Sequence, residues 1–278
     1  MAEVLRIENL KQHFVSGKGI FKKGYTIKAV DGVSFSIARG ETLGLVGESG
    51  CGKSTLGRTI LKLYEPTEGK IFFEGEDITS LSTKAMRPLR KDMQIVFQDP
   101  MESLNQRHTI GMILEEPFII HKVGTPEERK AWVKELLLKV GLPETAVNRY
   151  PHEFSGGQRQ RIGIARAIAL KPKLLICDES VSALDVSVQA QILNLLLQLQ
   201  KEMNLAIIFI SHDLSVVKHI SDNVVVMYFG KVVEMGPATE IYANPQADYT
   251  KKLLSAIPIT HPKDRKRKRR AGSAPNVA

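Results

Sequence analysis

The residues with the clearest capacity for chemistry form a glycine-rich loop near position 50. The stretch reads Gly47-Glu48-Ser49-Gly50-Cys51-Gly52-Lys53-Ser54-Thr55. It fits the pattern of a glycine, four residues and then Gly-Lys-Ser. Glycines permit torsions that turn several N–H groups toward one anion, and a following helix adds the positive end of its dipole. We predict a phosphate-binding loop in which Lys53 reaches the β- and γ-phosphates and Ser54 offers a hydroxyl to Mg²⁺.

A second glycine motif lies about a hundred residues further on. Phe154-Ser155-Gly156-Gly157-Gln158 precedes a run with helical periodicity over residues 162–170. Glycines at the start of a helix expose N–H groups that can bind an anion. Taken alone, the motif is either a weak second phosphate site or a simple helix cap.

Polar residues follow three short apolar strands. Asp178 and Glu179 come after residues 174–177, Gln98 after residues 93–97, and His212 after residues 206–210 and Ser211. Because ligands of open α/β sheets bind at the carboxyl ends of the strands, we expect these side chains to gather near the loop. Taken alone, the adjacent carboxylates of Asp178 and Glu179 are either part of a site or a solvated strand end.

The elements that must position these residues alternate between apolar strands and helical stretches. That alternation predicts an α/β core with a largely parallel sheet. Residues 100–155 are instead rich in helical patterns, with a helix start at Pro126 and a stop at Gly141, and we interpret them as an inserted helical subdomain. Residues 223–227 and 231–235 predict a hairpin, and residues 249–256 a last helix.

In this order the motifs resemble the ATP-binding cassette (ABC) family over residues 4–258, with Phe154 in place of the leading Leu of the signature Leu-Ser-Gly-Gly-Gln. The resemblance implies a P-loop NTPase (RecA-like) core with an antiparallel β region. It implies ATP hydrolysis by two head-to-tail cassettes. Each ATP would lie between the loop of one cassette and the signature of the other, here Ser155, Gly156, Gly157 and Gln158.

Further roles follow from the same resemblance. Residues 173–179 look like the Walker B strand and its catalytic glutamate, so Asp178 would hold Mg²⁺ and Glu179 would orient and deprotonate the attacking water. Gln98 matches the Q-loop, whose amide contacts Mg²⁺ and the water, and His212 matches the switch histidine at the γ-phosphate. Asp185, in Ser182-Ala183-Leu184-Asp185, matches the D-loop at the dimer interface. Phe14 best matches the adenine-stacking aromatic, with Tyr25 as the alternative. The family usually has Pro after the catalytic Glu, whereas this chain has Ser180.

The expected domain organisation divides the core in two. Residues 1–99 and 156–258 would form the ATPase core, residues 100–155 the helical subdomain, and residues 259–278 a basic, disordered tail. Residues 263–270 carry seven basic side chains and one acid, a net +6, so the rest of the chain holds +3 of the total +9. Such a tail is able to contact anionic lipid or nucleic acid, or simply to be solvated.

A narrower resemblance rests on Gly47 to Arg58, Phe97-Gln98-Asp99-Pro100, Ser103-Leu104-Asn105 and residues 182–191. These stretches are similar to the F-type ATPases of dipeptide, oligopeptide and nickel importers. The resemblance implies a different second ATPase chain (a heterodimer), two membrane permeases and an extracytoplasmic substrate-binding protein. Peptides are the first expected cargo and nickel or a nickel chelate the second.

Cysteine content and hydropathy indicate which cofactors and which cellular location to expect. Relatives often end in a cysteine-rich segment linked to an iron–sulfur cluster, but no cysteine follows Cys177, so we expect the basic tail in its place and no cluster. No apolar run approaches the ~20 residues that span a bilayer. The N-terminus does not resemble a signal peptide. We expect a peripheral protein on the cytoplasmic face of the inner membrane. A non-transport ABC ATPase acting on nucleic acid is not favoured, because neither a second cassette nor a coiled coil is present.

Overall fold

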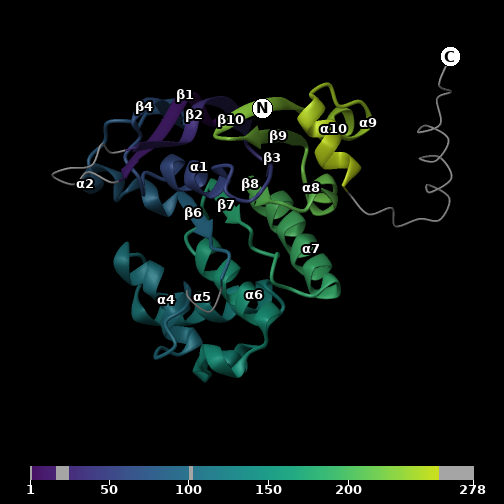
Figure 1. The fold of residues 1–278 in the computed structure, drawn as a ribbon. Coiled ribbons are helices and arrows are strands. Elements are labelled where there is room, and N and C mark those ends of the chain that lie inside the picture. Colours follow the sequence, from purple (N-terminus) through teal and green to yellow (C-terminus); the bar gives the residue numbers. More distant parts are fainter. Residues whose placement is uncertain (1, 17–24, 100–102, 257–278) are drawn as a thin grey trace, which may run out of the picture.

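The larger of two β-sheets contains the strands that the polar residues follow. The computed structural model describes residues 2–16, 25–99 and 103–256 (Figure 1). The strand order in this sheet is β10-β9-β3-β8-β7-β6, and all neighbours are parallel except the edge strand β10. The strands are β3 (Thr42–Val46), β6 (Met93–Val96), β7 (Leu174–Asp178), β8 (Ala206–Ser211), β9 (Asn223–Tyr228) and β10 (Lys231–Pro237). Every residue of β3, β7 and β8 is buried, as in parallel sheets covered on both faces.

The smaller sheet is antiparallel, as the resemblance implied, with the order β2-β1-β4-β5. Its strands are β1 (Glu3–Ser16), β2 (Tyr25–Ala38), β4 (Glu68–Phe73) and β5 (Glu76–Asp77). One hydrophobic cluster joins this sheet to one face of the larger sheet through helix α1 (Lys53–Ile60), with Leu56 and Ile60 fully buried. The phosphate-binding loop therefore begins on one sheet and ends on a helix held between both.

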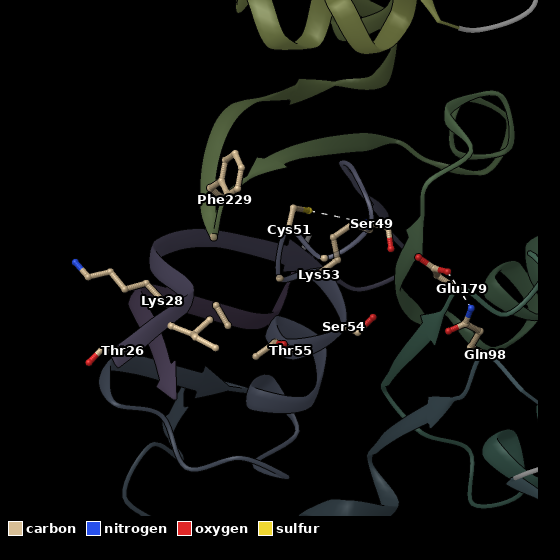
Figure 2. Close-up of a pocket in the computed structure, with 15 residues that line it drawn as sticks. Thr26, Lys28, Ser49, Cys51, Lys53, Ser54, Thr55, Gln98, Glu179 and Phe229 are labelled. Carbon is tan, nitrogen blue, oxygen red and sulfur yellow. Dashed lines mark hydrogen bonds between the residues drawn. The ribbon is translucent and has the colours of Figure 1, made fainter. Parts of the chain in front are cut away.

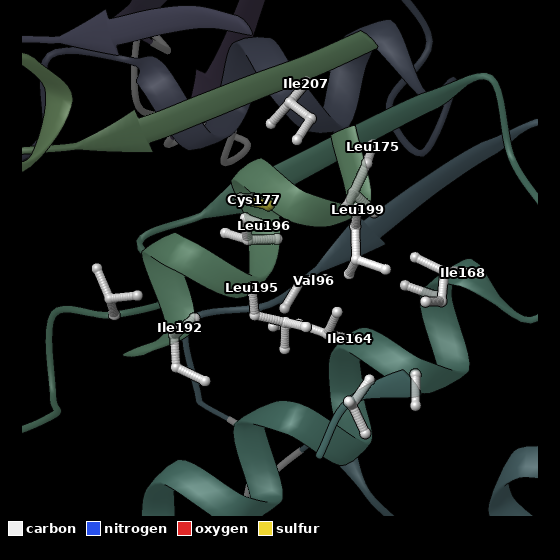
Figure 3. Close-up of a cluster of buried hydrophobic side chains, with 14 of the residues drawn as sticks. Val96, Ile164, Ile168, Leu175, Cys177, Ile192, Leu195, Leu196, Leu199 and Ile207 are labelled. Carbon is white, nitrogen blue, oxygen red and sulfur yellow. The ribbon is translucent and has the colours of Figure 1, made fainter. Parts of the chain in front are cut away.

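The other face of the larger sheet is covered by helices. Figure 3 shows Leu196 and Leu199 of α7 on the side of Cys177 and Leu175 of the sheet, and Leu195 beside Val96 and Ile164, all in one hydrophobic cluster. Besides α1, the described helices are α2 (Thr83–Met86), α4 (Ile110–Ile120), α5 (Pro126–Lys139), α6 (Gly156–Ile168), α7 (Val186–Met203), α8 (Leu214–Ile220), α9 (Ala238–Ala243) and α10 (Asp248–Ser255). Three short 3-10 helices are η1 (Leu89–Lys91), η2 (Glu144–Asn148) and η3 (Pro151–Glu153).

Helices α4 and α5 lie away from both sheets, and α6 connects them to the larger sheet (Figure 1). The predicted start of α5 at Pro126 is confirmed: Thr125 and Glu128 form a capping box there, and Gly141 follows the end of the helix with a φ of 73°. Helix α6 contacts α4 and α5 as well as α7 and β6. Packing therefore runs across the proposed domain boundary at residue 155.

The predicted hairpin and last helix are also confirmed. Strands β9 and β10 pair antiparallel around Phe229 and Gly230, and α10 covers Asp248–Ser255. The basic tail, residues 259–278, lies outside the described residues. Among the described helices, none combines the length and the hydropathy needed to cross a bilayer.

Candidate active site

The glycine-rich loop connects β3 to α1 and is wedged between β2 and β9. Gly52, with a φ of 106°, is the N-cap of α1, and a Cβ built on it would lie 1.9 Å from the carbonyl oxygen of Ala29. A Cβ on Gly47 would lie 2.2 Å from the carbonyl oxygen of Met227. These two positions accept no side chain without displacing a neighbouring backbone, so glycine is required for the loop to close.

Lys53 closes the loop from inside. Its side chain is buried, and its Nζ donates hydrogen bonds to the carbonyl oxygens of Gly47 at 2.8 Å and Glu48 at 2.9 Å. The ammonium group thus lies inside the ring of the loop and faces backbone oxygens that an anion would displace. This arrangement suits a cation that binds phosphate oxygens.

Ser54 and Asp178 meet at the mouth of the loop. The Ser54 hydroxyl donates to Oδ1 of Asp178 at 2.6 Å, and a guanidinium nitrogen of Arg58 lies 3.7 Å from Oδ2. Burial raises the pKa of Asp178, while the Ser54 hydrogen bond and the charge of Arg58 oppose the rise. A hydroxyl and a carboxylate in direct contact provide the hard oxygen ligands that Mg²⁺ prefers, so the donor set fits that ion.

Glu179 lies where the ends of three neighbouring strands converge. Its Oε2 accepts a hydrogen bond from Gln98 Nε2 at 3.1 Å and lies 3.5 Å from Nδ1 of His212. Its backbone has a φ of 48°, and its N–H donates to the Ile210 carbonyl at 3.0 Å. A non-glycine residue in the left-handed region costs about 1–2 kcal/mol. The strand ends therefore bring Gln98, Glu179 and His212 together, as the sequence predicted.

A cleft of about 580 Å³ opens beside these groups (Figure 2). Its walls are residues 49–55, residues 26–29 of β2, Gln98, Glu179, and the hairpin turn at Phe229 and Gly230. The volume is within the range of small-molecule sites. Gly47 and Glu48 belong to the same loop but do not line this cleft.

The aromatic residue at the rim of the cleft is one that the sequence reasoning missed. Phe229 is 74% exposed, has a φ of 43° and lines the cleft. Phe14 does not line it, and its ring packs edge-on against Tyr64 at 5.5 Å between centroids. Tyr25 is exposed and also lies outside the lining. The feature of the sequence that could have pointed to Phe229 is an aromatic residue in a predicted hairpin turn, directly before Gly230.

The signature motif lies outside the cleft. Ser155 is the N-cap of α6 and forms a capping box with Gln158: the Ser155 hydroxyl accepts from the Gln158 N–H at 3.3 Å, and Gln158 Oε1 accepts from the Ser155 N–H at 3.0 Å. Ser155, Gly156 and Gln158 are exposed, whereas Gly157 packs against Val188 of α7. The first turn of α6 therefore faces solvent rather than this chain's own cleft.

The D-loop residue Asp185 is the N-cap of α7, where its side chain makes no capping hydrogen bond. Leu184 beside it touches Gly156, since a Cβ on that glycine would lie 3.5 Å from a Leu184 methyl. The D-loop and the signature are therefore adjacent on one surface. Asp185 too is absent from the cleft lining.

Both cysteines are buried and free. Burial raises the pKa of Cys177 to about 12, and burial also raises the pKa of Cys51. Thiols held protonated in this way are poor nucleophiles and poor metal ligands. Ser180, in the position where the family usually has Pro, is buried next to Glu179.

Comparison with known families matches two regions of the chain. The ABC transporter family model matches residues 30–182, which include the loop, the signature, Asp178 and Glu179. The model for the C-terminal region of oligopeptide/dipeptide transporters matches residues 233–278. The basic tail that we expected in place of a cysteine-rich segment lies within this second matched region, and it contains no cysteine.

Individual relatives agree with these matches. The oligopeptide transport ATP-binding protein AppF of Bacillus subtilis is 57% identical, over 92% of this chain and 79% of its own length. The oligopeptide transport ATP-binding protein OppF of Escherichia coli is 54% identical, over 93% of this chain and 79% of its own length.

Two solved structures are similar across most of the fold. CbiO1 of Clostridium perfringens, part of the ABC transporter complex CbiONQ, has a TM-score of 0.76 and 30% identity, covering 93% of this chain and 97% of its own. The ATP-binding cassette MJ0796, in a dimeric post-hydrolysis state bound to ADP and Pi, has a TM-score of 0.74 and 28% identity, covering 84% and 98%. The chain therefore belongs to the ABC transporter family, as an ATPase cassette similar to the oligopeptide transport ATP-binding proteins.

Proposed function

We propose that this chain hydrolyses ATP to power the import of oligopeptides and dipeptides. The observation that carries the proposal is that the loop, Asp178 and Glu179 occur in one chain with a C-terminal region of the oligopeptide/dipeptide transporter type at residues 233–278. The names of the relatives at 54–57% identity support the same cargo. None of these relatives is named for nickel.

The phosphate end of the nucleotide would bind at the loop. Lys53 exchanges the carbonyl oxygens of Gly47 and Glu48 for phosphate oxygens, and the N–H groups of α1's first turn face the same anion. Ser54 and Asp178 would hold Mg²⁺ in place of their mutual hydrogen bond. When bound, the metal neutralises charge on the phosphates.

Glu179 is the proposed general base. Its carboxylate orients and deprotonates the attacking water, while Gln98 and His212 both contact its Oε2, at 3.1 and 3.5 Å. Both neighbours are exposed, so they are accessible to a bound γ-phosphate and would fix the water and the phosphate relative to each other. The left-handed backbone at Glu179 aims its side chain away from the strand and into this group.

A second cassette would complete the site. Ser155, Gly156 and Gln158 present a helix N-terminus to solvent, and Asp185 lies on the same surface. We infer that this surface closes over the nucleotide held by a related but different cassette, as in a heterodimer. The remaining subunits are two permeases and an extracytoplasmic binding protein, with this chain on the cytoplasmic face of the membrane.

The experiment that tests the proposal reconstitutes the chain with its second cassette, the permeases and the binding protein in vesicles. We expect uptake of labelled oligopeptides and a matching rise in ATP hydrolysis, both abolished by Lys53→Ala. ATP hydrolysis that responds to a nickel chelate but not to peptides would overturn the cargo while leaving the ATPase assignment intact.

A further inference from the structure

The phosphate-binding loop is in contact with the last described helix of the chain. The backbone N–H of Glu48, the second residue of the loop, donates a hydrogen bond to the hydroxyl of Tyr249 at 3.2 Å. Tyr249 belongs to α10, within the matched C-terminal region. The two residues are 201 positions apart in the sequence.

We propose that Tyr249 is a positioning residue of the ATP site, through which the C-terminal region holds the phosphate-binding loop in its binding conformation. The inference rests on the proposed function of the loop as an ATP site. It adds that α10, which contributes no residue to the cleft, controls how well the loop binds phosphate.

The backbone of Glu48 is held by two side chains, one of which is expected to leave when ATP binds. Tyr249 holds its N–H, and Lys53 Nζ holds its carbonyl oxygen at 2.9 Å. When Lys53 turns to the phosphates of ATP, it releases that carbonyl. The Tyr249 hydrogen bond then remains as the side-chain restraint on Glu48, and it keeps the following backbone N–H groups directed at the anion.

The Tyr249 ring supports the opposite wall of the cleft. It packs on Tyr228 with 4.2 Å between ring centroids, and Tyr228 packs on Phe229 at 4.5 Å. Phe229 lines the cleft, and the N–H of the next residue, Gly230, donates to the Cys51 carbonyl at 2.9 Å. One side chain of α10 thus contacts the loop through its hydroxyl and the hairpin turn through its ring.

Helix α10 is itself held in place, so the contact is able to transmit a restraint. Glu234 of β10 accepts hydrogen bonds from the backbone N–H groups of Gln246 at 2.7 Å and Ala247 at 3.1 Å, directly before the helix. Thr250, next to Tyr249, is fully buried. These contacts fix the start of α10 to β10, the edge strand of the larger sheet.

The test compares two tyrosines of the C-terminal region in the full-length chain. Tyr249→Phe removes the hydroxyl and keeps the ring. Tyr242→Phe removes a hydroxyl that donates to the Leu214 carbonyl at 2.6 Å, away from the loop. We expect Tyr249→Phe to raise the Kd for ATP about three- to tenfold, because one hydrogen bond to the loop is lost. In the assembled transporter, KM for ATP rises by the same factor and kcat at saturating ATP stays within about twofold.

Equal affinities in wild type and Tyr249→Phe, or an equal loss in Tyr242→Phe, would overturn the inference. Wild-type ATP binding in the same assay keeps this outcome distinct from a failure of the proposed function. If Tyr249→Phe does not fold, hydrogen exchange on the wild type decides. Since coupling is reciprocal, saturating ATP must slow amide exchange in residues 248–255, and unchanged exchange there would contradict the proposal.

Discussion

The two glycine motifs are both located at the N-terminus of a helix, yet their surroundings differ. The loop before α1 is enclosed: Lys53 is buried, Gly52 lies against the Ala29 carbonyl, and Ser54 is hydrogen-bonded to Asp178. The motif before α6 is exposed, and Ser155 and Gln158 form hydrogen bonds with each other. The loop before α1 is packed against other parts of its own chain, whereas the motif before α6 faces solvent.

Under the proposed function, this difference explains how one chain would contribute to two sites. The enclosed loop has the neighbours needed to bind phosphate and activate water, namely Asp178, Glu179 and Gln98. The exposed motif has donors and no catalytic neighbours within the described part of the chain. Its N–H groups are useful only to a ligand that another subunit brings. Changes in the two motifs should therefore have different effects on ATP binding and on hydrolysis.

The largest expected effect is from Glu179→Gln. The amide keeps the size of the side chain but cannot accept the proton, so hydrolysis by the assembled transporter should fall about 10²- to 10⁴-fold. ATP binding should remain, because Lys53 and Ser54 are untouched. Steady-state phosphate release and equilibrium ATP binding measure the two effects separately.

The control for this variant is Glu240→Gln, which changes an exposed carboxylate on α9. It should hydrolyse ATP at the wild-type rate. Wild-type turnover by Glu179→Gln would remove the general-base role from that residue.

The second-largest expected effect on ATP hydrolysis is from Ser155→Arg, in the exposed motif before α6. The arginine fills the surface that should close over the partner's nucleotide, so hydrolysis in the dimer should fall on the order of a hundredfold. ATP binding by the isolated subunit should stay within about twofold, because Ser155 is outside its own cleft.

Ser82→Arg is the matched control, because Ser82 is also an N-cap whose hydroxyl accepts a backbone N–H, here from Ala85 of α2. Both variants lose a cap worth about 1 kcal/mol. If Ser155→Arg weakens ATP binding by the isolated chain and Ser82→Arg does not, the shared-site model is wrong.

A smaller effect, on stability, compares two glycines. Gly52→Ala places a methyl 1.9 Å from the Ala29 carbonyl at a φ of 106°, and should cost about 2 kcal/mol of unfolding free energy. Gly156→Ala places it 3.5 Å from a Leu184 methyl, an ordinary contact, and should change the unfolding free energy by less than about 1 kcal/mol. Urea denaturation of the isolated subunit measures both, and equal losses would contradict the contrast between an enclosed and an exposed motif.

The proposed catalytic groups could be predicted from the sequence because each is defined locally. Lys53 and Ser54 belong to one short motif, and Asp178 and Glu179 directly follow one apolar strand. The rule that parallel strands end at one edge was enough to bring Gln98 and His212 to them, and the structure has them at 3.1 and 3.5 Å from Glu179. Local pattern and sheet topology together determine this part of the site.

The parts that the sequence did not predict depend on long-range packing. Tyr249 reaches Glu48 from 201 residues away, and Phe229 reaches the cleft because its turn is bonded to the Cys51 carbonyl. No periodicity or motif encodes either contact. Phe14 occupies the expected position along the chain, but its ring contacts Tyr64 rather than the cleft, since neighbouring side chains and not sequence position direct it.

The smallest expected effect comes from replacing the two aromatic residues, Phe229 in the cleft lining and Phe14 outside it. If the adenine ring packs on the aromatic side chain that lines the cleft, Phe229→Ala should raise the Kd for ATP about fivefold or more, in line with the loss of one base-stacking contact. Phe14→Ala should raise it by less than about twofold, since that ring is outside the lining. Titration with ATP and with inorganic triphosphate separates base from phosphate binding, because only the ATP titration should respond to Phe229→Ala. A larger loss in Phe14→Ala than in Phe229→Ala would restore Phe14 as the adenine contact and show that the β1–β2 edge moves onto the nucleotide when it binds.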